Sequence, residues 1–545
     1  MKTNLEIEQG FEKLPIGDVM ATLGVDPDSI NLHGKYIAKL PLSILRERAG
    51  HPDGKLVLVT AITPTRSGEG KTTVAIGLSD ALTRLGEKAV LCIREPSLGP
   101  YFGMKGGATG GGCAQVTPAE DINLHFTGDM YGVSKANNLL ASMIDNHLYF
   151  GNVLQIDSRR VTFKRVIDLN DRALRDIIIG LGGTSNGFPR RDGFDITPAS
   201  EVMTILSLAL DPADLHERLK RIIIGYSYQG EAVTCAQLKA DAAMVILLRD
   251  TIQPNVVQTL EHTPVIIHGG AFANIAHGCN TLFATKMALK LADYTVTEAG
   301  FGSDLGAEKF FDIKCRVGGL KPNVAVIVAT VRALKHHGDG SLEAGFTNLA
   351  KHIENVRCFG VPPVVAINRF ADDTDDELRA IEHCCRAAGV PVAVCDAFNQ
   401  GSAGAEELAR EVMKVAGEGS SSLRFLYPLK LSIREKMETI ATKMYGAAGV
   451  EYDRKALASI DQIEKLGFGN LPVCVAKTPA SLSDTPGLKG VPKGFTVRVN
   501  EVRLSAGAGL IVMLCGSIVT MPGLPRVSAA ELMQVDSDGQ TTTLA

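Results

Sequence analysis

The segment KLVLVTAITPTRSGEGKTTVAIGLSDALTRLG, residues 55–86, decides the fold. Its first residues form a nearly continuous apolar run, which is typical of a central strand covered by helices on both faces. A glycine-containing turn follows, and the residues from Thr72 onward have the spacing of a helix. A strand, a glycine-rich turn and a helix in this order predict a phosphate-binding loop within an α/β fold.

The turn supplies the groups that bind a nucleoside triphosphate. Gly68 and Gly70 allow the backbone to curl so that successive N–H groups face phosphate oxygens. Lys71 supplies a positive charge, Thr72 supplies a hydroxyl ligand for Mg²⁺, and the helix N-terminus adds its dipole. Thr65 stands where the first glycine of the G-x-x-x-x-G-K-T pattern is expected, so a glycine-rich turn without phosphate remains the alternative. The residues predicted to surround the ATP phosphates are Thr65, Arg66, Ser67, Gly68, Glu69, Gly70, Lys71 and Thr72.

Further short apolar runs alternate with amphipathic stretches along the chain. This alternation predicts a doubly wound, mostly parallel sheet of the P-loop NTPase-like kind, accompanied by smaller α/β domains. The runs predicted as strands are KAVLCI (88–93), AAMVILL (242–248), PVIIHGG (264–270), VAVIVATV (324–331), PVVAINRF (363–370) and VPVAVCDAF (390–398).

The length of 545 residues implies three or four domains of about 150 residues each. Changes in the sequence pattern along the chain place domain boundaries near residues 290 and 425. We expect a nucleotide-binding α/β domain with the phosphate loop at 1–290, a second α/β domain that contributes a ligand slot at 291–425, and a C-terminal α+β domain at 426–545. Residues 504–525 carry no charge, but their glycines and prolines predict a strand or hairpin rather than a membrane span.

In a doubly wound sheet the ligand crevice lies beyond the carboxyl ends of the strands. Arg94 follows one predicted strand, where its guanidinium could bind a carboxylate or a transferred phosphoryl group; a surface salt bridge is the alternative. If its strand neighbours the first one, Arg94 approaches the phosphate loop. Further polar residues at predicted strand ends are Thr63, His268, Glu298, Arg332, Asn368 and Asp396.

Two phenylalanines also follow predicted strands. Phe370 comes directly after VVAINR, and Phe398 directly after VAVCD. If these strands are neighbours, the two rings could face each other across a slot for one flat heterocycle. The alternative is that both rings are ordinary core residues.

Composition narrows the partners and the compartment. The net charge of −4 argues against nucleic acid as a partner, because nucleic-acid binders usually carry a basic excess. Eleven cysteines are too sparse for a disulfide framework and are expected to be reduced. Glu6, Glu8 and Glu12 interrupt the N-terminus where an export signal needs an apolar stretch. We therefore expect a cytoplasmic protein with no membrane partner.

Long blocks of the sequence are similar to one family. They are GEGKTT, REPSLGP, EDINLHFTGD, DGFDIT, ANIAHGCN, EAGFGSDLGAEKFFDIKCR, KHIEN, AINRF, LGFGNLP, LSAGAG and TMPGLP. On these blocks the chain resembles formate–tetrahydrofolate ligase over about nine-tenths of its length. The resemblance implies ATP-dependent formylation of tetrahydrofolate by formate through formyl phosphate, giving 10-formyltetrahydrofolate, ADP and phosphate.

The resemblance also implies roles for particular residues. Residues 65–72 would hold the ATP phosphates, Lys71 and Arg94 would act in catalysis with Arg94 on formyl phosphate, and Phe370 would form one face of the pterin slot. The family has tryptophan on the other face, in D-x-W-A-K-G-G-E-G-G, whereas this chain reads DAFNQGSAG with Phe398 there and Gln400 in place of the lysine. The family further implies Mg²⁺ with ATP, activation by a monovalent cation such as K⁺ or NH₄⁺, and a homotetramer.

Two other functions are compatible with the phosphate loop. One is another ATP-dependent ligase that activates a carboxylate on the same fold. The other is a nucleotide-switched assembly ATPase, since SGEGKT resembles the loops of dimerising ATPases. An assembly ATPase would need a membrane helix or metal-binding cysteines at a dimer face, and neither is evident in the sequence.

Overall fold

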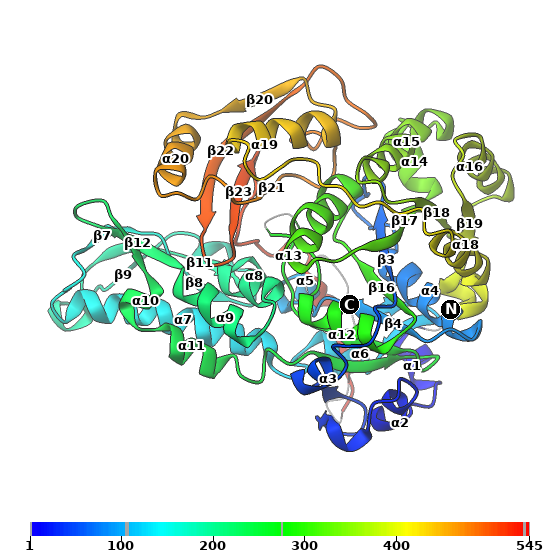
Figure 1. The fold of residues 1–545 in the computed structure, drawn as a ribbon, viewed down its shortest axis with the longest axis horizontal. Coiled ribbons are helices and arrows are strands. Elements are labelled where there is room, and N and C mark those ends of the chain that lie inside the picture. Colours follow the sequence, from blue (N-terminus) through cyan, green and yellow to red (C-terminus); the bar gives the residue numbers. More distant parts are fainter. Residues whose placement is uncertain (1–2, 104–107, 274–275, 538–540, 544–545) are drawn as a thin grey trace.

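The computed structural model describes residues 3–103, 108–273, 276–537 and 541–543. A twelve-stranded sheet runs through the middle of the molecule (Figure 1). In spatial order its main path is β1 (Asn31–Leu32), β2 (Ala38–Lys39), β14 (Asn255–Thr259), β15 (Pro264–Ile267), β4 (Ala89–Ile93), β16 (Tyr294–Glu298), β3 (Lys55–Ala61), β17 (Pro322–Ala329), β18 (Pro363–Asn368) and β19 (Val392–Cys395). β6 (Ala114–Thr117) pairs with β14, and β5 (Gly110–Gly111) pairs with β6.

The seven strands from β15 to β19 along this path are parallel, and the other pairings are antiparallel. The prediction of a large, mostly parallel α/β sheet is therefore confirmed. The expectation that β4 could lie beside β3 is wrong, because β16 is inserted between them and pairs with both. The carboxyl ends of all seven parallel strands meet at one edge of the sheet.

Helices cover both faces of the sheet because alternate residues of each strand point to opposite sides. In β3, Val57 and Val59 pack in one cluster with α4 (Lys71–Arg84) and α18 (Glu406–Gly417). Leu56 and Leu58 point the other way, into a cluster with α12 (Leu282–Leu291), α14 (Val331–His337), α15 (Leu342–Cys358) and α16 (Asp375–Ala387). This arrangement explains why the strand is apolar at consecutive positions.

The chain between β6 and β14 forms a lobe on the left of Figure 1, and its apolar cluster also includes residues from the C-terminal part of the chain, among them Cys474 and Leu510. Its longer helices are α7 (Asp129–Tyr149), α8 (Glu201–Leu208), α9 (Pro212–Lys220) and α11 (Asp241–Leu247). Its small sheets pair β7 (Ile156–Val161) and β13 (Ala232–Thr234) with β12 (Ile223–Ser227), β8 (Arg165–Ile167) with β11 (Phe194–Ile196), and β9 (Ile177–Ile179) with β10 (Arg190–Asp192).

The strand predicted over residues 242–248 is wrong, because this run lies mostly in the helix α11. Met244 is buried whereas Ile246 is 72% exposed, so one face of the helix packs inward and the other meets solvent. A short apolar run is compatible with either a strand or a helix, and only the surrounding packing chooses between them.

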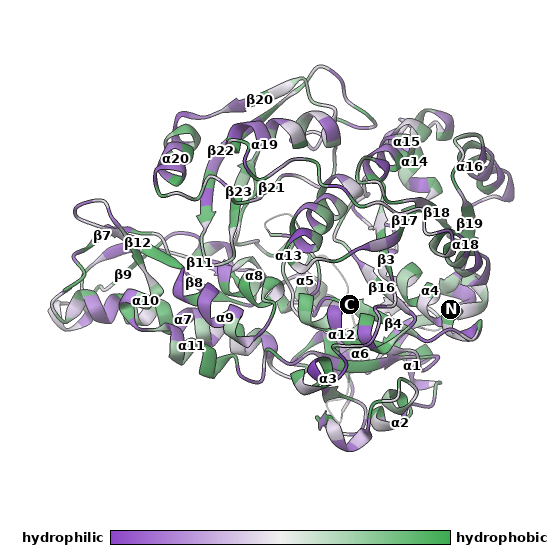
Figure 2. Cartoon of the chain, viewed as in Figure 1, coloured by the Kyte–Doolittle hydropathy of each residue, from purple (hydrophilic) through white to green (hydrophobic). Residues whose placement is uncertain are grey.

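A four-stranded sheet lies in the C-terminal part of the chain. Its order is β20 (Gly449–Tyr452), β22 (Thr496–Ser505), β23 (Leu510–Cys515) and β21 (Val473–Ala476), with α19 (Ile433–Ile440) and α20 (Arg454–Lys465). β23 lies within the uncharged segment 504–525, which confirms the strand or hairpin expected there, and its antiparallel partner β22 lies mostly before that segment. Figure 2 shows hydrophobic and hydrophilic residues interspersed on α20, as expected for a helix with one buried face.

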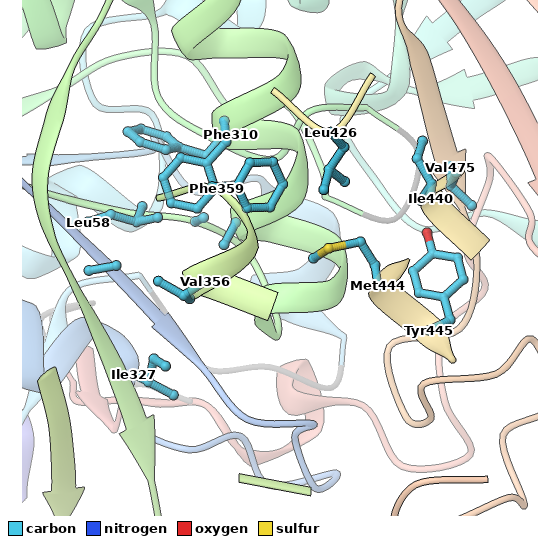
Figure 3. Packing of buried hydrophobic residues seen from close by; sticks show 14 of the residues in the cluster. Leu58, Phe310, Ile327, Val356, Phe359, Leu426, Ile440, Met444, Tyr445 and Val475 are labelled. Atoms are coloured by element: carbon cyan, nitrogen blue, oxygen red, sulfur yellow. The ribbon is translucent and has the colours of Figure 1, made fainter. Parts of the chain in front are cut away.

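One apolar cluster joins the large sheet to the C-terminal sheet. Figure 3 shows Leu58 and Phe359 on one side of it and Met444 and Val475 on the other. The predicted boundary near residue 425 falls before the C-terminal sheet, whereas strands from both sides of residue 290 belong to the same large sheet. None of the helices in the described ranges is long and apolar enough to cross a membrane.

Candidate active site

The glycine-rich turn lies between the end of β3 at Ala61 and the start of α4 at Lys71, in the middle of the parallel sheet. Gly68 and Gly70 have φ angles of 73° and 72°, in the left-handed region that favours glycine. A Cβ atom on Gly70 would lie 2.3 Å from Nδ2 of Asn368, whereas one on Gly68 would meet no atom within 4 Å. Gly70 is therefore required both by its backbone angle and by the close approach of Asn368.

The buried carboxylate of Glu69 holds the shape of this turn. Its Oε1 accepts hydrogen bonds from the Thr65 N–H at 2.6 Å and the Thr65 hydroxyl at 2.8 Å. Its Oε2 accepts one from the Thr330 hydroxyl at 2.6 Å, and the Glu69 carbonyl accepts one from Asn368 Nδ2 at 3.0 Å. Glu69 thus fastens its part of the turn to the ends of β17 and β18.

Lys71 and Thr72 begin α4 and lie beside an acidic residue at the end of β16, the strand that neighbours β3 in the sheet. Glu298 ends β16, and its Oε2 accepts a hydrogen bond from the Thr72 hydroxyl at 2.9 Å. Desolvation lowers the pKa of Lys71. The nearby carboxylates of Glu298 and Glu69 raise this pKa, whereas the positive charge of Arg94 lowers it further. Within the described residues, the Lys71 ammonium group makes no hydrogen bond, so its charge is available to an anionic ligand.

The hydroxyl of Thr72 and the carboxylate of Glu298 together fit a magnesium ion. Mg²⁺ prefers oxygen ligands and is usually held by one or two protein oxygens together with waters and substrate phosphates. Within the described ranges, no group of three or more His, Cys, Asp and Glu residues is placed to hold a metal without such help. The sequence places Glu298 at a strand end; its contact with Thr72 depends on β16 lying beside β3 and appears only in the fold.

Arg94 follows β4 at the same edge, with β16 between it and the glycine-rich turn. Its Nη1 donates a hydrogen bond to the Ala271 carbonyl at 3.1 Å. Its Nε is buried and has no hydrogen-bond partner among the described residues. A partly unsatisfied guanidinium at a crevice is suited to an anion, because it can donate two parallel hydrogen bonds.

Phe370 and Phe398 follow the neighbouring strands β18 and β19, whose ends are paired at Asn368 and Cys395. The strand neighbourhood required for the predicted slot is therefore present. The Phe370 ring carries the Arg332 guanidinium over one face, 4.1 Å from the ring centroid.

Phe398 is 43% exposed and lies in α17 (Ala397–Gln400). The backbone of Gly112 packs directly behind it, since a Cβ there would lie 2.1 Å from the Phe398 carbonyl oxygen. The Cys113 N–H donates a hydrogen bond to the same carbonyl at 2.8 Å. The side-chain amide of Gln400 donates to the Asp396 carboxylate at 2.7 Å instead of reaching outward. The end of the glycine-rich segment 106–112 thus supports Phe398; residues 106 and 107 lie outside the described residues.

A cavity of about 560 Å³ lies away from this edge, between the lobe that follows β6 and the C-terminal sheet. Residues that line it include Phe163, Lys164, Glu201, Tyr226 and Arg503. None of the residues predicted to bind ATP, formyl phosphate or folate lines this cavity. The residues predicted to act in the reaction gather instead at the edge of the parallel sheet.

The comparison with protein families agrees with the chemistry available at this edge. The sequence model of the formate–tetrahydrofolate ligase family matches residues 2–545, which is essentially the whole chain. Enzymes of this family are ligases that use ATP, with a divalent metal, to join formate to tetrahydrofolate. The chain therefore belongs to the formate–tetrahydrofolate ligase family.

Proposed function

We propose that the carboxyl edge of the parallel sheet is where this enzyme formylates tetrahydrofolate, in two steps through formyl phosphate. The observation that carries the proposal is the gathering of Lys71, the Thr72–Glu298 pair and the partly unsatisfied Arg94 beside the glycine-rich turn. All of these groups follow parallel strands that end at one edge. Their charges match the phosphates of ATP and the anion of formate.

The turn over residues 65–72 is the ATP phosphate site in this proposal, and the surrounding fold is of the P-loop NTPase-like kind. Backbone N–H groups of the turn and the N-terminus of α4 face the phosphate oxygens. Lys71 binds the β- and γ-phosphates, and Thr72 with Glu298 holds Mg²⁺. The metal ion, when bound, neutralises phosphate charge and orients the terminal phosphoryl group.

The first step joins two anions and therefore needs positive charge at the point of contact. A formate oxygen attacks the γ-phosphorus, a new P–O bond forms, and the bond to the β-phosphate oxygen breaks to release ADP. Lys71 and Arg94 offset the repulsion and stabilise the charge on the equatorial oxygens of the transferred group. Arg94 then retains formyl phosphate through its guanidinium.

The second step transfers the formyl group to folate held between Phe370 and Phe398. The acceptor nitrogen of tetrahydrofolate attacks the formyl carbon, a C–N bond forms, and the C–O bond to phosphate breaks. The nitrogen then loses its proton. This nitrogen is aniline-like and unprotonated at neutral pH, so no strong base is required. A stacked pterin also keeps water from the reactive mixed anhydride.

Membership of the family supports further properties. We extend the proposal to activation by a monovalent cation such as K⁺ or NH₄⁺, assembly into a homotetramer and a cytoplasmic location. The three-part division at residues 290 and 425 is likewise a proposal about which segments fold together.

One assay tests the proposed reaction and separates it from the two alternatives. ADP release is measured with formate and tetrahydrofolate present together or singly, and the product is detected by its absorbance after acid conversion to methenyltetrahydrofolate. We expect sustained release over many turnovers only when both are present, at most one ADP per active site with formate alone, and loss of release in Lys71→Ala. ADP release that is independent of formate would indicate an assembly ATPase, and release driven by another carboxylate would indicate a different ligase.

A further inference from the structure

Arg332 links the glycine-rich turn to the Phe370 ring, and the reaction scheme above gives it no role. It lies in the first turn of α14, two residues after Thr330, which caps that helix and binds Glu69. Its Nη2 donates a hydrogen bond to the Gly68 carbonyl, and its Nε lies 3.5 Å from Glu69 Oε2. The same guanidinium covers the Phe370 ring at 4.1 Å.

These contacts use different parts of one rigid group. The edge of the guanidinium meets the turn, and its planar face meets the aromatic ring, which is the geometry of a cation–π contact. A planar group cannot tilt at one side without tilting at the other. A change in the Gly68 carbonyl or the Glu69 carboxylate is therefore passed to the position of the Phe370 ring.

The rest of the turn is held by contacts that do not reach the ring. Glu69 is fixed by Thr65 and Thr330, and Asn368 binds the Glu69 carbonyl. The Phe370 N–H donates a hydrogen bond to Asp373 Oδ2 at 2.8 Å, which holds the backbone of Phe370 and not its ring. Among the described contacts, Arg332 is the side chain that touches both the turn and the ring.

We propose that Arg332 is a positioning residue that couples the nucleotide site to the folate site. A triphosphate bound in the turn fixes the position of the Gly68 carbonyl and, through it, the position of the Arg332 guanidinium. The guanidinium in turn holds the Phe370 ring in the orientation that receives the pterin. Folate then binds with less loss of conformational freedom, which produces positive cooperativity without a large structural change. This inference rests on the proposed assignment of residues 65–72 to ATP and of Phe370 to folate.

The test measures the dissociation constant of tetrahydrofolate by calorimetry, with and without Mg²⁺ and the non-hydrolysable analogue AMP-PNP. In the unmodified enzyme we expect the nucleotide to tighten folate binding by about fivefold or more, the lower end of usual couplings. In Arg332→Met and Arg332→Lys we expect this factor to fall below about twofold, because methionine lacks the charge and lysine lacks the planar face. Each ligand alone should still bind both variants.

Arg369→Met is the matched control. Arg369 is adjacent to Phe370, but its guanidinium pairs with Asp375 at 3.2 Å instead of the turn. We expect this variant to keep the full coupling factor. Equal folate affinity with and without nucleotide in the unmodified enzyme would overturn the inference, as would full coupling in either Arg332 variant or loss of nucleotide binding in both. Failure of AMP-PNP to bind the unmodified enzyme would instead refute the proposed ATP site.

Discussion

Replacing Gly70 by alanine tests the geometry of the nucleotide turn. Gly70 has a φ of 72°, and an added Cβ would lie 2.3 Å from Asn368 Nδ2, which donates to the Glu69 carbonyl. The left-handed conformation costs a non-glycine residue about 1–2 kcal/mol. Displacing Asn368 removes a hydrogen bond worth about 1 kcal/mol.

These two contributions sum to about 2–3 kcal/mol. The apolar packing of β3 and α4 holds both ends of the turn in place. Strain is therefore relieved when the turn leaves the conformation that binds nucleotide. Since 1.36 kcal/mol corresponds to a tenfold change, Gly70→Ala should weaken binding of Mg²⁺–AMP-PNP by roughly 30- to 150-fold. Calorimetry measures this constant directly, and circular dichroism checks that the variant is folded.

Gly68→Ala is the matched control for this experiment. Its φ of 73° is nearly the same, but a Cβ there would meet no atom within 4 Å. The strain of about 1–2 kcal/mol should weaken nucleotide binding by only roughly 5- to 30-fold. Equal losses in the two variants would refute the reasoning that Asn368 clamps the turn, and unchanged binding in both would refute the assignment of this turn to ATP.

Four further substitutions have defined outcomes. Arg94→Ala should lower kcat/KM for formate by roughly 100-fold, about 3 kcal/mol, and a near-normal rate in steady-state kinetics would contradict its role. Glu298→Gln should raise the Mg²⁺ concentration needed for half-maximal activity in a metal titration; an unchanged requirement would remove Glu298 from the metal site. Phe398→Trp should lower the KM for folate while leaving that for ATP unchanged, because the indole offers a larger stacking surface; no change would place Phe398 outside the slot. Burial raises the pKa of Glu201 to about 7, although hydrogen bonds from backbone N–H groups partly oppose this rise. The carboxyl group therefore ionises more readily in the unfolded chain than in the folded one. Its contribution to the unfolding free energy should therefore fall between pH 4.5 and 7 by at most about 3 kcal/mol, and chemical denaturation of Glu201→Gln should show a flatter profile over that range.

Much of the candidate site was predictable because its residues are local to strand ends. An apolar run marks a buried strand, and the polar residue that follows it must lie at the rim of the sheet. The glycine-rich turn and Arg94 are placed by this rule, and Phe370 and Phe398 likewise follow strands of the sheet. The strand predicted at 242–248 is the exception. This apolar run is too short to specify its own conformation, and it folds as a helix.

The remaining contacts depend on residues far apart in the chain. The Thr72 hydroxyl donates a hydrogen bond to Glu298, which lies 226 residues later in the chain. The contact forms because β16 lies beside β3, in the place where β4 was expected. Arg332 reaches both Gly68 and Phe370 because β17 lies between β3 and β18. Local sequence specifies where a strand ends and which side chain follows it. The order of the strands is set by the joint burial of apolar faces across the whole sheet, and that order selects which of these side chains become neighbours.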